Sequence, residues 1–174
     1  MLVTAQPESW VLKFSSQIPP GPILDLACGK GRHGRYFLAR GHSVTFLDRD
    51  ISGVVDLLSH PKTQLMEYDL ENNSPWPFLK NQFSGIVIIN YLYRPLLPNL
   101  LTALKPGGLL IYKTFAAGNE QFGRPRSPEF LLQENELLDT FSQHFEIIDF
   151  TQGKESNPNR VTQAICARRV MHRY

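Results

Sequence analysis

Short apolar runs alternate with amphipathic stretches along the chain from residue 22 onward. The apolar and β-branched runs predict strands, and several stretches between them have the spacing and stop signals of helices. Residues 83–90 are apolar almost throughout, as expected of a strand that is covered on both faces of a sheet. The expected strands are 22–27, 43–48, 63–67, 83–90, 109–115, 145–150 and 161–167, and the expected helices are 32–40, 52–59, 95–104 and 134–141.

This alternation predicts an α/β fold, in which a doubly wound, mostly parallel sheet carries helices on both faces. The last two strands are expected to pair as an antiparallel hairpin. Sheets of this kind bind ligands outside the carboxyl ends of their strands, where the strand order reverses. The loops 28–34, 48–50 and 90–94 are expected there. The segment 117–130 is long for such a connection, which makes it a candidate lid.

Length and composition restrict the class of protein. The 174 residues predict a single domain, 1–174, with a cap helix within residues 1–20. A net charge of +2 gives no strong field for nucleic acid, and no segment is apolar enough to span a membrane. The two cysteines cannot form a disulfide framework, and residues 1–10 lack the pattern of a secretory signal. We therefore expect a cytoplasmic protein without a membrane partner.

A glycine-rich loop follows the first expected strand. Residues 28–34 read CGKGRHG, in which Gly29 and Gly31 begin a G-x-G-x-x-G pattern that opens a helix. Asp48 lies 19 residues after Gly29, at the end of the next expected strand. Glycines allow close approach to the backbone, helix N-termini favour anions, and an acid at this distance binds ribose hydroxyls. The pattern indicates a nucleotide but does not identify it.

Asp25 narrows the choice of ligand because it interrupts the otherwise apolar first strand close to the glycine loop. A carboxylate is unfavourable beside a pyrophosphate and favourable beside an ammonium group. A nucleoside that carries an amino acid, such as S-adenosylmethionine, accounts for both Asp25 and Asp48. The expected cofactor is therefore S-adenosylmethionine.

Four segments together resemble the class I S-adenosylmethionine-dependent methyltransferases. Residues 23–31 (ILDLACGKG) resemble motif I of that family, and 44–48 (VTFLD) are similar to its second motif. Residues 68–70 (YDL) lie where the family has an adenine-binding acid, and 104–110 (LKPGGLL) resemble the turn before its fifth strand. The resemblance covers about residues 8–168 and is nearest to small stand-alone bacterial enzymes, including tellurite-resistance-like methyltransferases.

The resemblance implies a Rossmann-like sheet of seven strands with the last strand antiparallel. It also implies which residues serve the reaction. Tyr91 and Arg94 follow the fourth strand, where the family places substrate and methyl-facing groups, so both are candidate catalytic residues. No metal-ligand spacing is visible among the histidines. The candidate cofactor-binding residues are Asp25, Gly29, Gly31, Asp48, Asp69 and Asn90.

The expected reaction is methyl transfer to a small acceptor whose identity the sequence does not give. An aromatic face at Tyr91 can contact the sulfonium, and Arg94 or a lid arginine could hold an anionic acceptor. The alternatives are an NAD-linked oxidoreductase, a non-catalytic module that binds S-adenosylmethionine, and an RNA methyltransferase. For RNA, the basic residues Arg168, Arg169, His172 and Arg173 could contact phosphates, although nucleic acid is the less favoured partner.

Overall fold

The computed structural model describes residues 5–171 and contains a seven-stranded sheet in the order β3-β2-β1-β4-β5-β7-β6. The strands are β1 (Ile23–Leu26), β2 (Val44–Asp48), β3 (Thr63–Glu67), β4 (Phe83–Ile89), β5 (Leu104–Phe115), β6 (Phe145–Glu155) and β7 (Arg160–Arg169). The helices are α1 (Ser9–Phe14), α2 (Arg32–Leu38), α3 (Leu97–Ala103) and α4 (Glu136–Phe141). Short 3₁₀ turns occupy Ser15–Gln17, Ser52–Leu57, Arg94–Leu96, Asn119–Gln121 and Pro128–Phe130.

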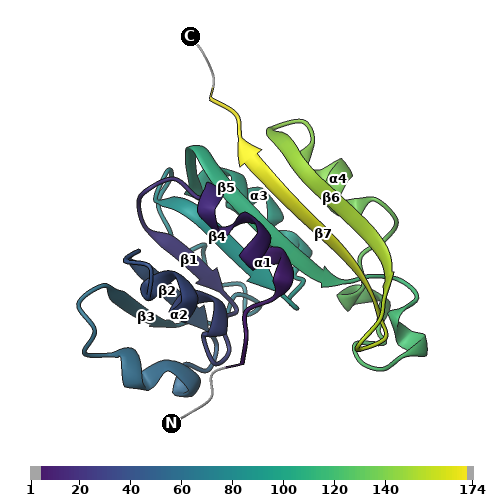
Figure 1. The fold of residues 1–174 in the computed structure, drawn as a ribbon, viewed down its shortest axis with the longest axis horizontal. Coiled ribbons are helices and arrows are strands. Elements are labelled where there is room, and N and C mark those ends of the chain that lie inside the picture. The colour runs from purple at the N-terminus through teal and green to yellow at the C-terminus, as the bar shows by residue number, and fades with distance from the viewer. Residues whose placement is uncertain (1–4, 172–174) are drawn as a thin grey trace.

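The strand directions confirm the predicted fold class. β1, β2, β3, β4 and β5 run parallel to one another, whereas β7 is antiparallel to both β5 and β6 (Figure 1). Every residue of β4 is buried, as its continuous apolar sequence predicts. The sheet is therefore the Rossmann-like, mostly parallel sheet with an antiparallel last strand.

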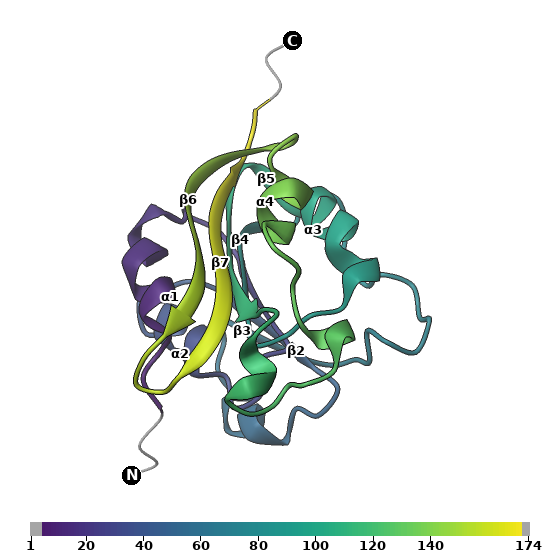
Figure 2. The same cartoon turned by 90° about the vertical axis from the view of Figure 1, so that its right-hand side faces the viewer.

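Two layers of helices cover the sheet. α1 and α2 lie on one face and α3 and α4 on the other (Figure 2). Trp10, Val11 and Phe14 of α1 pack in one apolar cluster with β1, β2, β4, β5 and β7. Leu97 and Leu137 belong to the cluster on the opposite face. Burial of both faces explains why the central strands carry few polar residues.

Several predicted boundaries differ from the structure. The cap helix expected within 1–20 is limited to α1 and one 3₁₀ turn, and residues 1–4 lie outside the described part. The helix expected at 52–59 is a 3₁₀ turn whose first amide, on Ser52, donates to Asp50 at 2.9 Å. The turn expected within 104–110, before a strand at 109–115, belongs to β5, which begins at Leu104 and shifts its register against β4.

Within residues 5–171, none of the helices has the length and apolar content needed to cross a bilayer.

Candidate active site

The loop between β1 and α2 leaves its backbone open at one point. Gly29 and Gly31 have left-handed conformations, with φ values of +54° and +70°. A Cβ atom at Gly29 would meet no protein atom within 4 Å, so the space beside it is open. A Cβ atom at Gly31 would lie 2.6 Å from Val54 and 2.9 Å from Phe46. Gly29 therefore leaves room for a ligand, whereas packing against β2 already requires a glycine at position 31.

Asp48 at the end of β2 is fixed to this loop. Its Oδ2 accepts a hydrogen bond from the backbone N–H of Gly29 at 2.8 Å, and its Oδ1 accepts one from Asp50 at 3.1 Å. Each carboxylate oxygen can accept a second hydrogen bond, so Asp48 can still bind hydroxyl groups. The fold thus brings together the glycine loop and the acid that the sequence places 19 residues further along.

A cavity of about 400 Å³ lies beside Asp48, at the carboxyl ends of β1, β2, β3 and β4. The strand order reverses between β1 and β4, which is where such sheets bind their ligands. The volume falls in the range of roughly 300–1,000 Å³ that is typical of small-molecule sites. The lining residues are Ala27, Leu47, Asp48, Arg49, Tyr68, Asp69, Leu70, Glu71, Asn90, Tyr91 and Phe130.

Asp69 and Asn90, both proposed from the sequence, line this cavity together with Asp48. Asp69 lies in the turn after β3, where its Oδ1 accepts a hydrogen bond from the amide of Glu71 at 2.8 Å. Asn90 follows β4 in a left-handed conformation, with φ of +59°. Its backbone N–H donates to the backbone carbonyl of Lys113 at 2.9 Å. Among the lining residues Arg49 is the one cation. The acidic wall suits a ligand with hydroxyl, amino and cationic groups better than a pyrophosphate.

Asp25 lies beneath the glycine loop and does not line the cavity. Its carboxylate is 3% exposed and accepts a hydrogen bond from the backbone N–H of Gly34 at 2.8 Å. Burial raises the pKa of Asp25 to about 7, against the lowering effect of the Gly34 hydrogen bond. Its predicted contact with a cofactor ammonium group remains a prediction.

Tyr91 reaches the cavity from the end of β4. Its backbone carbonyl accepts a hydrogen bond from the hydroxyl of Tyr112 at 2.8 Å, which fixes the backbone there. Burial, and then the nearby Glu71 carboxylate, raise the pKa of the Tyr91 phenol well above its ordinary value. The phenol is therefore protonated at physiological pH and available as a hydrogen-bond donor.

Arg94 does not line the cavity that contains Tyr91. Its guanidinium donates to both carboxylate oxygens of Glu136, at 2.6 and 2.9 Å. It also donates to the carbonyl oxygens of Glu129 at 2.8 Å and Leu131 at 2.9 Å. These contacts hold the backbone on both sides of Phe130, so Arg94 acts on the cavity wall through Phe130. Direct binding of an acceptor by Arg94 remains a prediction.

The candidate lid, 117–130, is held to the rest of the protein at both ends, and its last residue reaches the cavity. Asn119 is 2% exposed, and its Oδ1 accepts a hydrogen bond from the amide of Val161 in β7 at 3.1 Å. Phe130, at the other end, lines the cavity and is 42% exposed. Whether the segment opens and closes remains a prediction.

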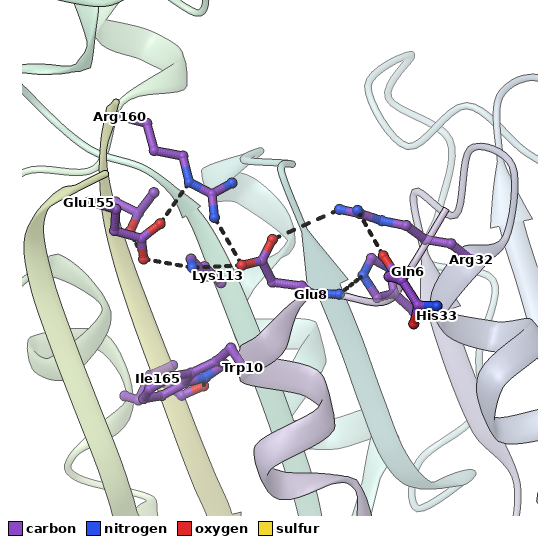
Figure 3. A network of polar contacts seen from close by, with 10 residues as sticks. Gln6, Glu8, Trp10, Arg32, His33, Lys113, Glu155, Arg160 and Ile165 are labelled. Atoms are coloured by element: carbon purple, nitrogen blue, oxygen red, sulfur yellow. Dashed lines mark hydrogen bonds and ion pairs between the residues drawn. The ribbon is translucent and has the colours of Figure 1, made fainter. Parts of the chain in front are cut away.

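A network of charges lies near the glycine loop, centred on Glu8 (Figure 3). The Glu8 carboxylate accepts hydrogen bonds from Lys113 of β5 at 2.8 Å and Arg160 of β7 at 2.9 Å. Its backbone N–H donates to His33 at 3.2 Å, and the carbonyl of Gln6 accepts from Arg32. The segment before α1 is thus held to the start of α2 and to β5 and β7.

The structure adds candidate site residues that the sequence analysis did not name individually. Glu71 and Phe130 line the cavity, and Glu8 carries the charge network. Glu71 could have been suspected from its position two residues after Asp69 in the same expected loop. Phe130 is a large apolar residue in a polar segment, which is a weak signal for a binding surface. Nothing in the sequence pattern joins Glu8 to residues more than 100 positions away.

The basic residues suggested for RNA binding are partly engaged elsewhere. Arg168 donates to the carbonyl of Gly107 at 3.1 Å, and Arg169 donates to Asn81 at 2.7 Å. His172 and Arg173 lie outside the described residues. Arg168 and Arg169 are therefore hydrogen-bonded to other parts of the chain.

Comparisons with known proteins identify the family. The sequence profile of the family described as tellurite resistance protein TehB matches residues 3–157, whereas no curated protein matches the chain. An S-adenosylmethionine-dependent methyltransferase from Methanosarcina mazei is similar in structure (TM-score 0.69, 18% identity), over 97% of this chain and 100% of that one. TehB from Haemophilus influenzae is similar with a TM-score of 0.73 and 20% identity, over 94% of this chain and 62% of that one.

A third similar structure is the 1,6-didemethyltoxoflavin-N1-methyltransferase of Burkholderia thailandensis, crystallised with 1,6-didemethyltoxoflavin and S-adenosylhomocysteine. Its TM-score is 0.70 at 17% identity, and the match covers 94% of this chain and 77% of that one. The family match over most of the sequence and the shared fold confirm the resemblance drawn from the four motifs. The chain belongs to the TehB family and is an S-adenosylmethionine-dependent methyltransferase.

Proposed function

We propose that this methyltransferase acts in the cytoplasm on a small-molecule acceptor that binds beside Tyr91. The observation that carries the proposal is the acidic cavity at the switch point of the sheet, where the lining residue Asp48 is hydrogen-bonded to the open backbone at Gly29. The methyltransferase crystallised with 1,6-didemethyltoxoflavin supports a small acceptor, because it acts on a small molecule with the same fold.

The residues present fit S-adenosylmethionine. The free lone pairs of Asp48 would bind the ribose hydroxyls, and the open space at Gly29 would admit the amino-acid end. Asp69 and Asn90 would contact the base from the other side of the cavity. When bound, S-adenosylmethionine supplies a methyl group that its sulfonium has already activated. The protein therefore needs to hold an acceptor in line with that methyl and to exclude water.

Replacing Asp48 with alanine tests the cofactor site. We expect the Asp48→Ala variant to bind S-adenosylmethionine and S-adenosylhomocysteine about 30-fold more weakly by calorimetry. The reason is the loss of hydrogen bonds to a charged acceptor, on the order of 2 kcal/mol. Asp139→Ala is the matched control, because Asp139 is an exposed acid of α4 that does not line the cavity.

Equal affinities in the Asp48 and Asp139 variants would refute this assignment, as would wild-type protein that binds NAD in preference to S-adenosylmethionine. Release of S-adenosylhomocysteine with any acceptor would exclude a module that binds without catalysis.

A further inference from the structure

A second, smaller cavity of about 190 Å³ adjoins the first. The two cavities share Glu71, Asn90, Tyr91 and Phe130 as walls. The remaining walls come from the ends of β4 and β5 and from the candidate lid: Leu92, Thr114, Phe115 and Pro125. Since one water occupies roughly 30 Å³ of liquid, this space holds only a small molecule. Its position beside the larger cavity is where an acceptor would meet a methyl group.

The charge of the smaller cavity has one sign. Among its lining residues Glu71 is the one that carries a formal charge. The Glu71 backbone is fixed by the hydrogen bond from its amide to Asp69 at 2.8 Å. Neither Arg124 nor Arg126 lines the cavity, and Arg94 is engaged with Glu136. An anionic acceptor would therefore meet a carboxylate here and no cation among the walls.

The uncharged walls are largely aromatic. Tyr91, Phe115 and Phe130 bring three rings to the same small space. Ring faces attract cations and pack against planar groups. The Tyr91 phenol stays neutral, because burial and the Glu71 carboxylate oppose its ionisation. Aromatic walls with one carboxylate are complementary to a molecule that has an apolar body and a basic nitrogen.

We infer that the methyl acceptor is a small nitrogen base, held by its N–H group at Glu71 and by its apolar part against Tyr91, Phe115 and Phe130. The inference rests on the proposed function and specifies its substrate class. It differs from the expectation that an arginine holds an anionic acceptor.

A carboxylate at this position can serve nitrogen methylation. A nitrogen that binds as the ammonium ion first gives one proton to solvent through Glu71. The lone pair of the neutral nitrogen then forms the new bond to the methyl carbon, and the electron pair of the broken carbon–sulfur bond stays on sulfur. The positive charge thereby moves from sulfur to nitrogen, where the Glu71 carboxylate stabilises it. The methylated nitrogen then gives its proton to Glu71, which passes it to solvent.

A pair of probes that differ in charge tests the inference. Benzylamine and benzoate are titrated into the protein saturated with S-adenosylhomocysteine, and amide shifts at residues 90–92 and 114–115 are followed by NMR. We expect benzylamine to bind at least fivefold more tightly than benzoate. The preference should disappear in Glu71→Gln and persist in Glu67→Gln, a matched control at an exposed residue that lines neither cavity.

Tighter binding of benzoate, a preference retained in Glu71→Gln, or no shift at these amides with either probe would overturn the inference. The same samples separate it from the proposed function. Failure of S-adenosylhomocysteine to bind would refute the cofactor site, whereas normal binding without a charge preference would refute the acceptor class alone.

Discussion

At the scale of single residues, the sharpest prediction concerns Asp25, the buried acid of β1. Asp25 has a pKa of about 7 in the folded protein, against an ordinary value of 3.8. Between these values the native state holds a proton that the unfolded state lacks, so raising the pH through this range lowers the free energy of unfolding. We expect the loss to be on the order of a few kcal/mol between pH 4 and 8.

The Asp25→Asn variant should lack this part of the pH dependence, because the amide oxygen can still accept from Gly34 and does not titrate. Urea unfolding of both proteins across the range is the measurement, and Asp139→Asn is the control. Parallel profiles for wild type and Asp25→Asn would show that Asp25 titrates normally.

Single residues also show which features of the site could be predicted from the sequence. The pairing of Asp48 with the glycine loop follows from spacing, because parallel strands end at the same edge of a sheet. The separate roles of Gly29 and Gly31 cannot be predicted from spacing, because they depend on which residues of β2 and the 52–57 turn face the loop. A bulky residue at position 31 would collide with Val54 and Phe46. If such a variant lost cofactor binding, the cause would be a distorted loop and not the loss of a cofactor contact.

At the scale of elements, Arg94 links Glu136 of α4 to the end of the candidate lid, residues 129–131. We expect Arg94→Ala to accelerate amide exchange at Phe130 and Leu131 about tenfold, which corresponds to roughly 1.4 kcal/mol of lost local stability. The reason is that the variant removes donors to the carbonyl oxygens of Glu129 and Leu131.

The control for this link is Arg126→Ala, which changes an exposed arginine of the same segment. Equal exchange rates in wild type and Arg94→Ala would mean that other contacts hold the segment.

The elements themselves were predictable where burial sets the pattern. The largely buried strands at 22–27, 43–48 and 83–90 were expected within one residue of their observed bounds. The strand at 63–67, which has no buried residue, was also expected with its observed bounds. The first strand of the final hairpin, by contrast, was expected at 145–150 and extends five residues further, to Glu155. The second was expected at 161–167 and spans Arg160–Arg169. The outer half of the hairpin is mostly polar, so backbone pairing continues where no apolar alternation marks it.

At the scale of the whole molecule, the Glu8 network joins the first described segment to the last strands. Burial opposes the charge of Glu8, but Lys113 and Arg160 hold its pKa below the ordinary value. We expect Glu8→Gln to destabilise the protein by about 2 kcal/mol in urea unfolding, because Lys113 and Arg160 lose the charged acceptor that they share and keep only Glu155.

Asp149→Asn provides the comparison, since it removes an ion pair with Lys13 whose side chains are 32% and 56% exposed. Pairs this exposed contribute about 0–1 kcal/mol, so this variant should change little. Similar losses in the two variants would show that burial does not distinguish the network from a surface pair.

Contacts between residues far apart in the sequence also determine when the fold can form during synthesis. The Trp10 indole donates to Ile165, and Glu8 binds Arg160, so α1 depends on residues made more than 150 positions later. β7 lies between β5 and β6, so the sheet has a gap until that strand leaves the ribosome. A nascent chain stopped before residue 160 would expose the apolar side of α1 and leave Glu8 without Arg160. This methyltransferase therefore closes its fold only after residues 160–169 have been made, and until then its exposed apolar surface is prone to aggregation.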